Sequence, residues 1–179
     1  MYSDVSKILF TKEQIKKRVN ELGKLISDKY RGEEVLMVCV LKGSSIFYAD
    51  LVRAMDIPVE FDFIHVSSYG ESDKSSGEVK INKDLTVDIK NKNIVVVEDI
   101  IDTGYTMKAL VPMLKARGPK SVTVCAMLDK PARRTVDFQA DYIGFEIPDE
   151  FVIGYGLDYA HKYRNIPEIC VFDTAKLKK

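Results

Sequence analysis

Three carboxylates and a Thr/Gly/Thr turn stand together in the middle of this chain of 179 residues. A continuous apolar run, residues 94–97, ends at Glu98 and Asp99, and a third carboxylate, Asp102, precedes the turn formed by residues 103–106. Carboxylate oxygens accept hydrogen bonds from hydroxyls and hold hard cations such as magnesium. The turn offers backbone N–H groups, hydroxyls and a helix start, which together bind phosphate without a lysine. The segment predicts a site for a ligand that carries both hydroxyls and phosphate.

Two buried strands are expected to position these groups. Residues 94–97 and residues 35–41 are short, strongly apolar and rich in β-branched side chains, as in strands covered on both faces of a parallel sheet. Ligands of such sheets bind beyond the carboxyl ends of the strands. Lys42 and Gly43 follow the second strand, so a lysine and open N–H groups there suit a second phosphate group. Gly104 lets the backbone approach a ligand closely or adopt positive φ.

Simpler interpretations of these motifs also exist. A lone Asp-Thr-Gly is more often an ordinary turn with a helix cap, and a loop lysine is more often solvated surface. The buried strand and the acidic pair in front of Asp102 favour the binding interpretation instead. The chain has neither a G-x-G-x-x-G stretch after a strand nor a G-x-x-x-x-G-K-[ST] loop. It is therefore neither a dinucleotide-binding nor a Walker A protein by motif.

The remaining pattern alternates strands and helices. Thr11 and Gln14 predict a capping box at the start of a helix with apolar residues at helical spacing. Further helices are predicted at residues 46–55 and 105–117, the latter kinked or broken at Pro112. Predicted strands cover residues 35–41, 59–66, 79–81, 85–89, 94–97, 122–128 and 169–172, with a long polar loop at residues 67–78. This order predicts one α/β domain, residues 1–179, with a mostly parallel sheet flanked by helices.

Composition narrows the partners and the compartment. The formal net charge is zero, with 46% hydrophobic and 30% charged residues, so no basic footprint points to nucleic acid. Apolar stretches are too short to span a bilayer, and the N-terminus does not resemble a signal peptide. Cys39, Cys125 and Cys170 lie in apolar runs without metal-site spacing, which predicts buried thiols and a cytoplasmic location.

The segment from Val95 to Thr106 resembles the phosphoribosyl-pyrophosphate motif of the type I phosphoribosyltransferases. The wording Val-Glu-Asp-Ile-Ile-Asp-Thr-Gly is close to that of the hypoxanthine-guanine branch, and the resemblance is clearest from Leu36 to Phe172. It implies a twisted parallel sheet with a small hood formed by the terminal segments. It also implies purine salvage: transfer of 5-phosphoribosyl from phosphoribosyl pyrophosphate to N9 of hypoxanthine, and of guanine, with Mg²⁺ as cofactor.

The resemblance also implies a role for individual residues. Asp102 would be the catalytic acid or base at the purine, and Glu98 and Asp99 would hold the ribose hydroxyls. The 5-phosphate would bind to Asp102, Thr103, Gly104, Tyr105 and Thr106. Pyrophosphate would bind to Lys42, Gly43 and Arg164, with a cis peptide bond between Leu41 and Lys42. The purine would meet Lys130, Phe151 and Val152; the metal would meet Glu98, Asp99 and Asp158; Ser68 and Tyr69 would open a lid loop.

Two other functions compete with this one. A xanthine-preferring transferase would differ only in how its pocket receives the 2-position of the base. A regulator that senses phosphoribosyl pyrophosphate and binds nucleic acid would need a basic surface, which the zero net charge does not supply. The family resemblance further implies small-molecule substrates, self-association as a homodimer or homotetramer, and neither a nucleic-acid nor a membrane partner.

Overall fold

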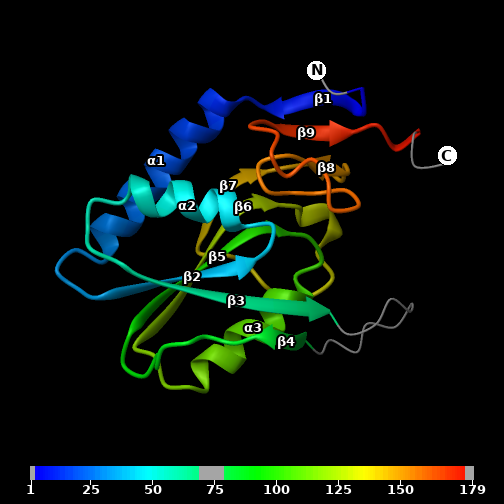
Figure 1. The fold of residues 1–179 in the computed structure, drawn as a ribbon. Coiled ribbons are helices and arrows are strands. Elements are labelled where there is room, and N and C mark those ends of the chain that lie inside the picture. Colours follow the sequence, from blue (N-terminus) through cyan, green and yellow to red (C-terminus); the bar gives the residue numbers. More distant parts are fainter. Residues whose placement is uncertain (1–2, 69–78, 176–179) are drawn as a thin grey trace.

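The computed structural model describes residues 3–68 and 79–175, which form two β-sheets and three α-helices in that part of the chain (Figure 1). The larger sheet has six strands in the order β4-β3-β2-β5-β6-β7, parallel throughout except for the β3–β4 pair. Its strands are β2 (Val35–Leu41), β3 (Glu60–Ser68), β4 (Val79–Lys83), β5 (Asn93–Ile101), β6 (Ser121–Asp129) and β7 (Tyr142–Glu146). The predicted α/β class with a mostly parallel sheet is confirmed.

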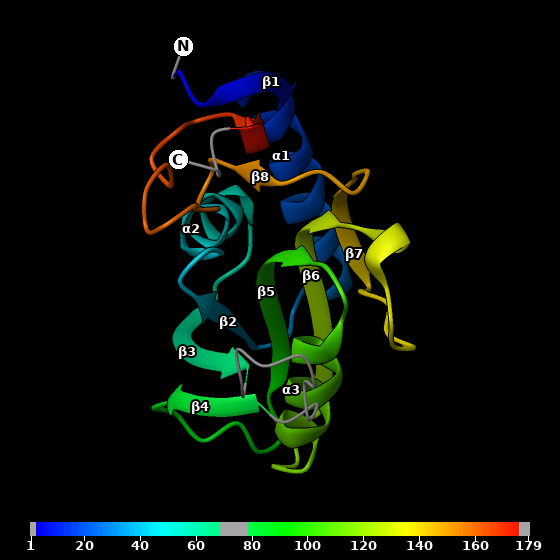
Figure 2. The ribbon, with the colours of Figure 1, turned by 90° about the vertical axis from the view of Figure 1, so that its right-hand side faces the viewer.

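Side-chain alternation along β2 and β5 divides the core into two layers. Met37 and Val95 face the layer formed with α1 (Lys12–Lys29) and α2 (Ser45–Ala54), whereas Val38 and Val96 face α3 (Tyr105–Lys115). All four side chains are fully buried. A strand covered on both faces has no polar side to show, which explains the continuous apolar runs in the sequence. The helices thus cover opposite faces of the sheet, as Figures 1 and 2 show.

The two ends of the chain meet in a second, three-stranded antiparallel sheet of order β1-β9-β8. Its strands are β1 (Val5–Phe10), β8 (Val152–Ile153) and β9 (Ile169–Phe172). This small sheet lies above the carboxyl-terminal side of the main sheet (Figure 2). It matches the expected hood of terminal segments. β1 was not predicted. Apolar and polar side chains alternate only weakly along it, and its partner strand β9 is more than 150 positions away in the sequence.

The helix ends follow local chemistry. Thr11 forms the predicted capping box with Gln14: its hydroxyl accepts the Gln14 N–H and the Gln14 side chain accepts the Thr11 N–H. α3 continues through Pro112, so the predicted break is absent. Pro112 lies in the eighth position of this helix, where only one turn remains after it.

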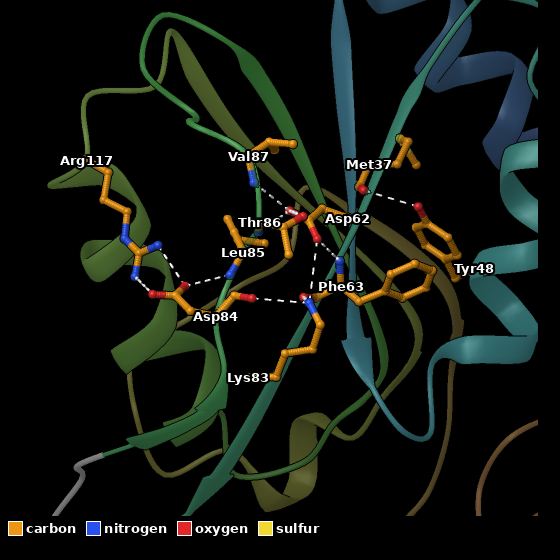
Figure 3. Close-up of polar contacts among 10 residues, drawn as sticks. All are labelled: Met37, Tyr48, Asp62, Phe63, Lys83, Asp84, Leu85, Thr86, Val87 and Arg117. Atoms are coloured by element: carbon orange, nitrogen blue, oxygen red, sulfur yellow. Dashed lines mark hydrogen bonds and ion pairs between the residues drawn. The ribbon is translucent and has the colours of Figure 1, made fainter.

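The prediction of a strand at residues 85–89 was wrong. These residues run as irregular chain, held by the buried carboxylate of Asp62 (Figure 3). Asp62 accepts the backbone N–H groups of Phe63, Thr86 and Val87 at 2.6–3.1 Å. The apolar side chains of residues 85–89 led us to expect a strand. In the structure the carboxylate of Asp62, and not the carbonyls of a neighbouring strand, accepts the N–H groups of this segment.

The predicted loop at residues 67–78 begins later than expected, since β3 extends to Ser68 and β4 starts at Val79. Residues 69–78, including Tyr69 of the expected lid, lie outside the described residues. All three cysteines are buried and free, as predicted. No helix in the described ranges is long and apolar enough to cross a membrane.

Candidate functional site

A cavity of about 230 Å³ opens at the carboxyl ends of β2 and β5. The residues that line it include both predicted phosphate turns and the three carboxylates. They are Val40, Leu41, Lys42, Gly43, Val66, Glu98, Asp99, Ile100, Ile101, Asp102, Thr103, Gly104, Thr106 and Met107. Parallel pairing of the two strands sets their ends side by side, which is why motifs about 55 positions apart share one cavity.

The turn after β2 packs directly against the acidic pair. The peptide bond between Leu41 and Lys42 is cis, as the family resemblance implied. A Cβ atom added to Gly43 would lie 1.5 Å from Oδ2 of Asp99, so no larger residue fits there without moving that carboxylate. Glycine at this position lets the backbone of the turn after β2 contact the carboxylate of Asp99, which lies near the turn at residues 103–106.

Glu98 and Asp99 form an acidic pair in which Glu98 is buried and Asp99 is partly buried. Burial, and then repulsion by Asp99, raise the pKa of Glu98 well above its usual value. Burial also raises the pKa of Asp99, although hydrogen bonds and the nearby Arg164 guanidinium oppose it. Both carboxylates accept backbone N–H groups of the strand end, from Asp99 and Ile100. Such a pair is poised to receive positive charge or hydroxyl donors from a ligand.

The acidic pair suits a magnesium ion that arrives with its substrate. Within residues 3–68 and 79–175, no three His, Cys, Asp or Glu side chains gather closely enough to hold a metal by themselves. Mg²⁺ commonly binds through one or two carboxylates and keeps its other positions for water and substrate phosphates. Glu98 and Asp99 supply the carboxylate share of such a site, and their oxygens are of the type that Mg²⁺ prefers.

The phosphate turn opens the third helix. Gly104 has φ +89° and is the residue before α3, so the N–H groups of the following turn are free to face an anion. Thr103 and Thr106 line the cavity beside it, whereas Tyr105 does not. A backbone cradle at a helix start with two hydroxyls is the arrangement predicted for phosphate.

Asp102 differs from the acidic pair in its surroundings. Its side chain is 41% exposed, and Nε of Arg133 lies 3.2 Å from its Oδ1. Arg133 also lies 3.8 Å from Asp149. Asp102 therefore stands at the accessible rim of the cavity, where a carboxylate can reach a ligand group above the phosphate turn.

Arg164 joins the site through the segment after β8. Its guanidinium pairs with Asp158 at 2.7 Å and donates to the carbonyl of Gly156 at 2.6 Å. A Cβ atom at Gly156 would lie 2.0 Å from the carbonyl oxygen of Gly43. The segment thus packs against the turn at Lys42 and Gly43. Asp158 is held by Arg164 and by the His161 N–H, and it does not line the cavity with Glu98 and Asp99.

None of the predicted purine residues lines the cavity of the phosphate turns, although Lys130 is hydrogen-bonded to its wall. Lys130 follows β6, is 7% exposed, and donates its N–H to the carbonyl of Ile101 at the end of β5. Val152 is buried in β8, while Phe151 is 41% exposed and packs edge-on against Tyr159 and Phe172. Phe151 lines a separate cavity of about 280 Å³ on the small sheet. Lys130 thus lies at the end of the main sheet, whereas Phe151 and Val152 belong to the small sheet.

A larger cavity of about 540 Å³ lies between α1, α2 and the segment at residues 165–167. It contains none of the predicted site residues. Volume alone does not mark a reactive site, whereas the smaller cavity brings together three carboxylates, a lysine and two open turns. We therefore take the smaller cavity as the candidate active site.

Sequence reasoning missed the contacts that residues after Lys130 make with the phosphate turn. Arg133 and Arg134 both reach Asp102, one at its carboxylate and one at its backbone carbonyl. Gly156 was also missed. The arginines stand next to each other after a strand end, yet nothing in their spacing indicates which loop they contact, because that depends on tertiary packing.

Comparisons with known proteins agree with this geometry. A family model described as a phosphoribosyl transferase domain matches residues 6–160. The hypoxanthine-guanine phosphoribosyltransferase of Bacillus subtilis is 47% identical over 98% of the chain and 97% of its own length. A hypoxanthine phosphoribosyltransferase structure from Staphylococcus aureus superposes with a TM-score of 0.96 at 41% identity, covering 100% of this chain and 97% of that one.

The chain also matches part of longer proteins. The bifunctional protein TilS/HprT of Listeria monocytogenes is 47% identical over 94% of the chain, and the match spans about a quarter of that protein, 26% of its length. The family model, the full-length relatives and the shared fold agree with one another. The chain belongs to the phosphoribosyltransferase family, in its hypoxanthine-guanine branch.

Proposed function

We propose that this protein transfers the 5-phosphoribosyl group from phosphoribosyl pyrophosphate to N9 of hypoxanthine, and of guanine, in the cytoplasm. The observation that carries the proposal is the single cavity in which the turns at Lys42 and Gly43 and at residues 103–106 flank the carboxylates of Glu98 and Asp99. A substrate with a phosphate at one end, a pyrophosphate at the other and two hydroxyls between them matches that order of groups. The names of the full-length relatives support the same substrates.

Binding aligns the reacting carbon. Residues 103–106 hold the 5-phosphate through backbone N–H groups and hydroxyls, and Lys42 and Gly43 hold the pyrophosphate with Arg164 beside them. Glu98 and Asp99 accept the two ribose hydroxyls. Anchoring both ends of the sugar fixes its anomeric carbon opposite N9 of the base, which converts a bimolecular step into an oriented one.

Charge moves as the pyrophosphate leaves. Its departure with the bonding electrons leaves positive charge on the ribose ring, which the carboxylates of Glu98 and Asp99 stabilise. Bound Mg²⁺ would neutralise the leaving pyrophosphate, with Glu98 and Asp99 and, through the segment after β8, Asp158 as its protein partners. Asp102 handles the imidazole proton of the purine as N9 bonds to carbon.

The base is recognised at the border of the two sheets. Lys130 donates to the exocyclic oxygen of a 6-oxopurine, Phe151 stacks on the ring and the Val152 backbone meets its edge. Ser68 and Tyr69 open the lid that closes over the reacting sugar and excludes water. We also propose self-association as a homodimer or homotetramer.

An absorbance assay tests the proposal. Purified protein with Mg²⁺ and phosphoribosyl pyrophosphate is offered hypoxanthine, guanine, xanthine and adenine separately. We expect rapid use of hypoxanthine and guanine and none of adenine, because Lys130 selects a 6-oxo group. Preference for xanthine would change the base assignment, and no reaction with any purine would refute the transferase.

A further inference from the structure

An arginine behind the phosphate turn is the feature that the proposed mechanism leaves unused. Arg134 follows the short 3-10 helix at Pro131–Arg133, and its side chain is 15% exposed. Its guanidinium donates in three directions: Nε to the carbonyl of Asp102 at 3.2 Å, one terminal nitrogen to the carbonyl of Phe138, and the other to the carboxylate of Asp129. An enclosed cation is costly unless it is fully paired, so this set of contacts fixes the side chain.

The same segment packs against the turn itself. A Cβ atom at Gly104 would lie 2.9 Å from Cδ of Arg134 and 2.8 Å from a methyl group of Val136. The N–H of Thr135 donates to the carbonyl of Thr103 at 3.1 Å. Residues 134–136 therefore pack directly against the phosphate turn at residues 103–106.

These contacts hydrogen-bond the carbonyl groups of Asp102 and Thr103, whose partial negative charge would repel a phosphate. The carbonyl of Asp102 is held by Arg134 and that of Thr103 by Thr135. A carbonyl oxygen carries partial negative charge, so a turn whose carbonyls face the cavity would repel an anion. With both carbonyls engaged behind the turn, the N–H groups that follow are the ones left to face the cavity.

Asp129 links the guanidinium of Arg134 to the main sheet. It is the last residue of β6, lies opposite Ile101 of β5 in the strand register, and has a side chain only 10% exposed. Arg134 thus connects the end of β6 to the turn at residues 103–106, which starts two residues after Ile101. A planar guanidinium reaches three acceptors at fixed angles, which an ammonium group does not.

We propose that Arg134, held by Asp129, is a positioning residue that keeps the phosphate turn in its anion-binding shape. The inference rests on the proposed function, since it assigns the turn to the 5-phosphate. Arg134 does not touch the ligand in this account. It acts through the carbonyl of Asp102, and its loss weakens phosphate binding at the turn while the pyrophosphate turn after β2 keeps its own shape.

The experiment measures two ligands separately by isothermal titration calorimetry. Ribose 5-phosphate reports on the turn at residues 103–106, and pyrophosphate with Mg²⁺ reports on Lys42 and Gly43. For Arg134→Ala we expect ribose 5-phosphate to bind about tenfold to a hundredfold more weakly, the range of one or two charge-assisted hydrogen bonds. Pyrophosphate affinity should stay within about twofold, and KM for phosphoribosyl pyrophosphate should rise more than that for hypoxanthine.

Matched variants separate positioning from general damage. Arg117→Ala removes a two-contact arginine pair with Asp84 on the far side of α3, and it should change neither affinity (Figure 3). Arg134→Lys should not restore ribose 5-phosphate binding, whereas millimolar guanidinium ion added to Arg134→Ala should restore part of it. Asp129→Asn should shift the same affinity in the same direction by a smaller factor, and it serves if Arg134→Ala does not fold.

Several results would overturn the inference. Unchanged ribose 5-phosphate affinity in Arg134→Ala and Asp129→Asn would remove the positioning role. An equal loss of both ligands would reduce Arg134 to a structural ion pair, and full recovery in Arg134→Lys would make charge, not geometry, the cause. Failure of the wild-type protein to bind ribose 5-phosphate would instead refute the proposed function itself.

Discussion

Asp102 has a side chain that is 41% exposed, whereas Glu98 is buried, and we propose Asp102 as the carboxylate that exchanges a proton with the purine. Asp102→Asn keeps the size and the backbone carbonyl that Arg134 holds but removes the group that accepts a proton. We expect turnover to fall about a hundredfold or more, the usual share of one general acid or base. Phosphoribosyl pyrophosphate binding should change little. Steady-state rates and calorimetry check both parts, and unchanged turnover would remove Asp102 as the catalyst.

Gly43 lies where the turn after β2 contacts the carboxylate of Asp99. In Gly43→Ala the new Cβ atom would stand 1.5 Å from Oδ2 of Asp99, so the carboxylate or the turn must move. Because such a shift displaces both a hydroxyl acceptor and the pyrophosphate turn, we expect kcat/KM to fall about a hundredfold.

Gly32→Ala is the matched control for that change. Gly32 has φ +82° and open space around it, so alanine there costs about 1 kcal/mol of stability but should leave activity intact. Equal activity in Gly43→Ala and wild type would mean that the turn and Asp99 do not act together.

The elements that were predicted well from the sequence are those whose pattern lies within one short stretch of the chain. The buried strands β2 and β5 and the capped helix α1 carry their own patterns. β1 depends on a partner at the other end of the chain, and residues 85–89 depend on the carboxylate of Asp62. The same holds for the site. Motif residues were predicted one by one, but the contact of Arg134 with Asp102 exists only after folding.

Asp62 shows how one side chain organises an element. Burial acts against its charge, yet the N–H groups of Phe63, Thr86 and Val87 and the Thr86 hydroxyl hold the pKa of Asp62 below its usual value (Figure 3). A lowered folded-state pKa contributes stability above the unfolded-state pKa, and that contribution disappears as pH falls through the folded-state pKa. The segment after β4 is therefore expected to loosen in acid.

Asp62→Asn makes this expectation measurable. It replaces one of the two acceptor oxygens by an NH2 group, which cannot accept from the N–H groups that it faces, and we expect the free energy of unfolding at pH 7 to fall by about 2 kcal/mol. The difference from wild type should shrink below pH 3.8, the ordinary pKa of an aspartate, as Asp62 itself becomes protonated. Urea unfolding at a series of pH values measures it. Asp88→Asn, at an exposed carboxylate in the same segment, should show no such difference; a gap that stays constant with pH would contradict the charge argument.

At the scale of the whole molecule, the cavity is lined by residues at the carboxyl ends of the main sheet, and a second, small sheet is built from both chain ends. The segment after β8 carries Arg164 and Gly156 from the small sheet onto the pyrophosphate turn. The chain between β8 and β9 thus joins the small sheet to the turn after β2.

The outer part of β3 is the surface that best fits the proposed self-association. Phe61 is 56% exposed and Phe63 36% exposed, both beside the buried ring of Tyr48. β4 pairs only with residues 65–68 of this strand, so among the described residues no strand pairs with the outer side of the earlier part of β3, although Lys83 and Asp62 bond the Phe63 backbone there. Exposed aromatic side chains on a strand edge are typical of contact surfaces.

We therefore expect Phe61→Glu to shift the protein to a smaller species in size-exclusion chromatography with light scattering, because a charge there must be desolvated on association. Leu25→Glu is the control: Leu25 is 48% exposed on α1, away from β3, and its replacement should leave the mass unchanged. The same elution mass for Phe61→Glu and wild type would exclude this strand edge as the contact. A loss of mass in both variants would point to a wider surface that includes α1.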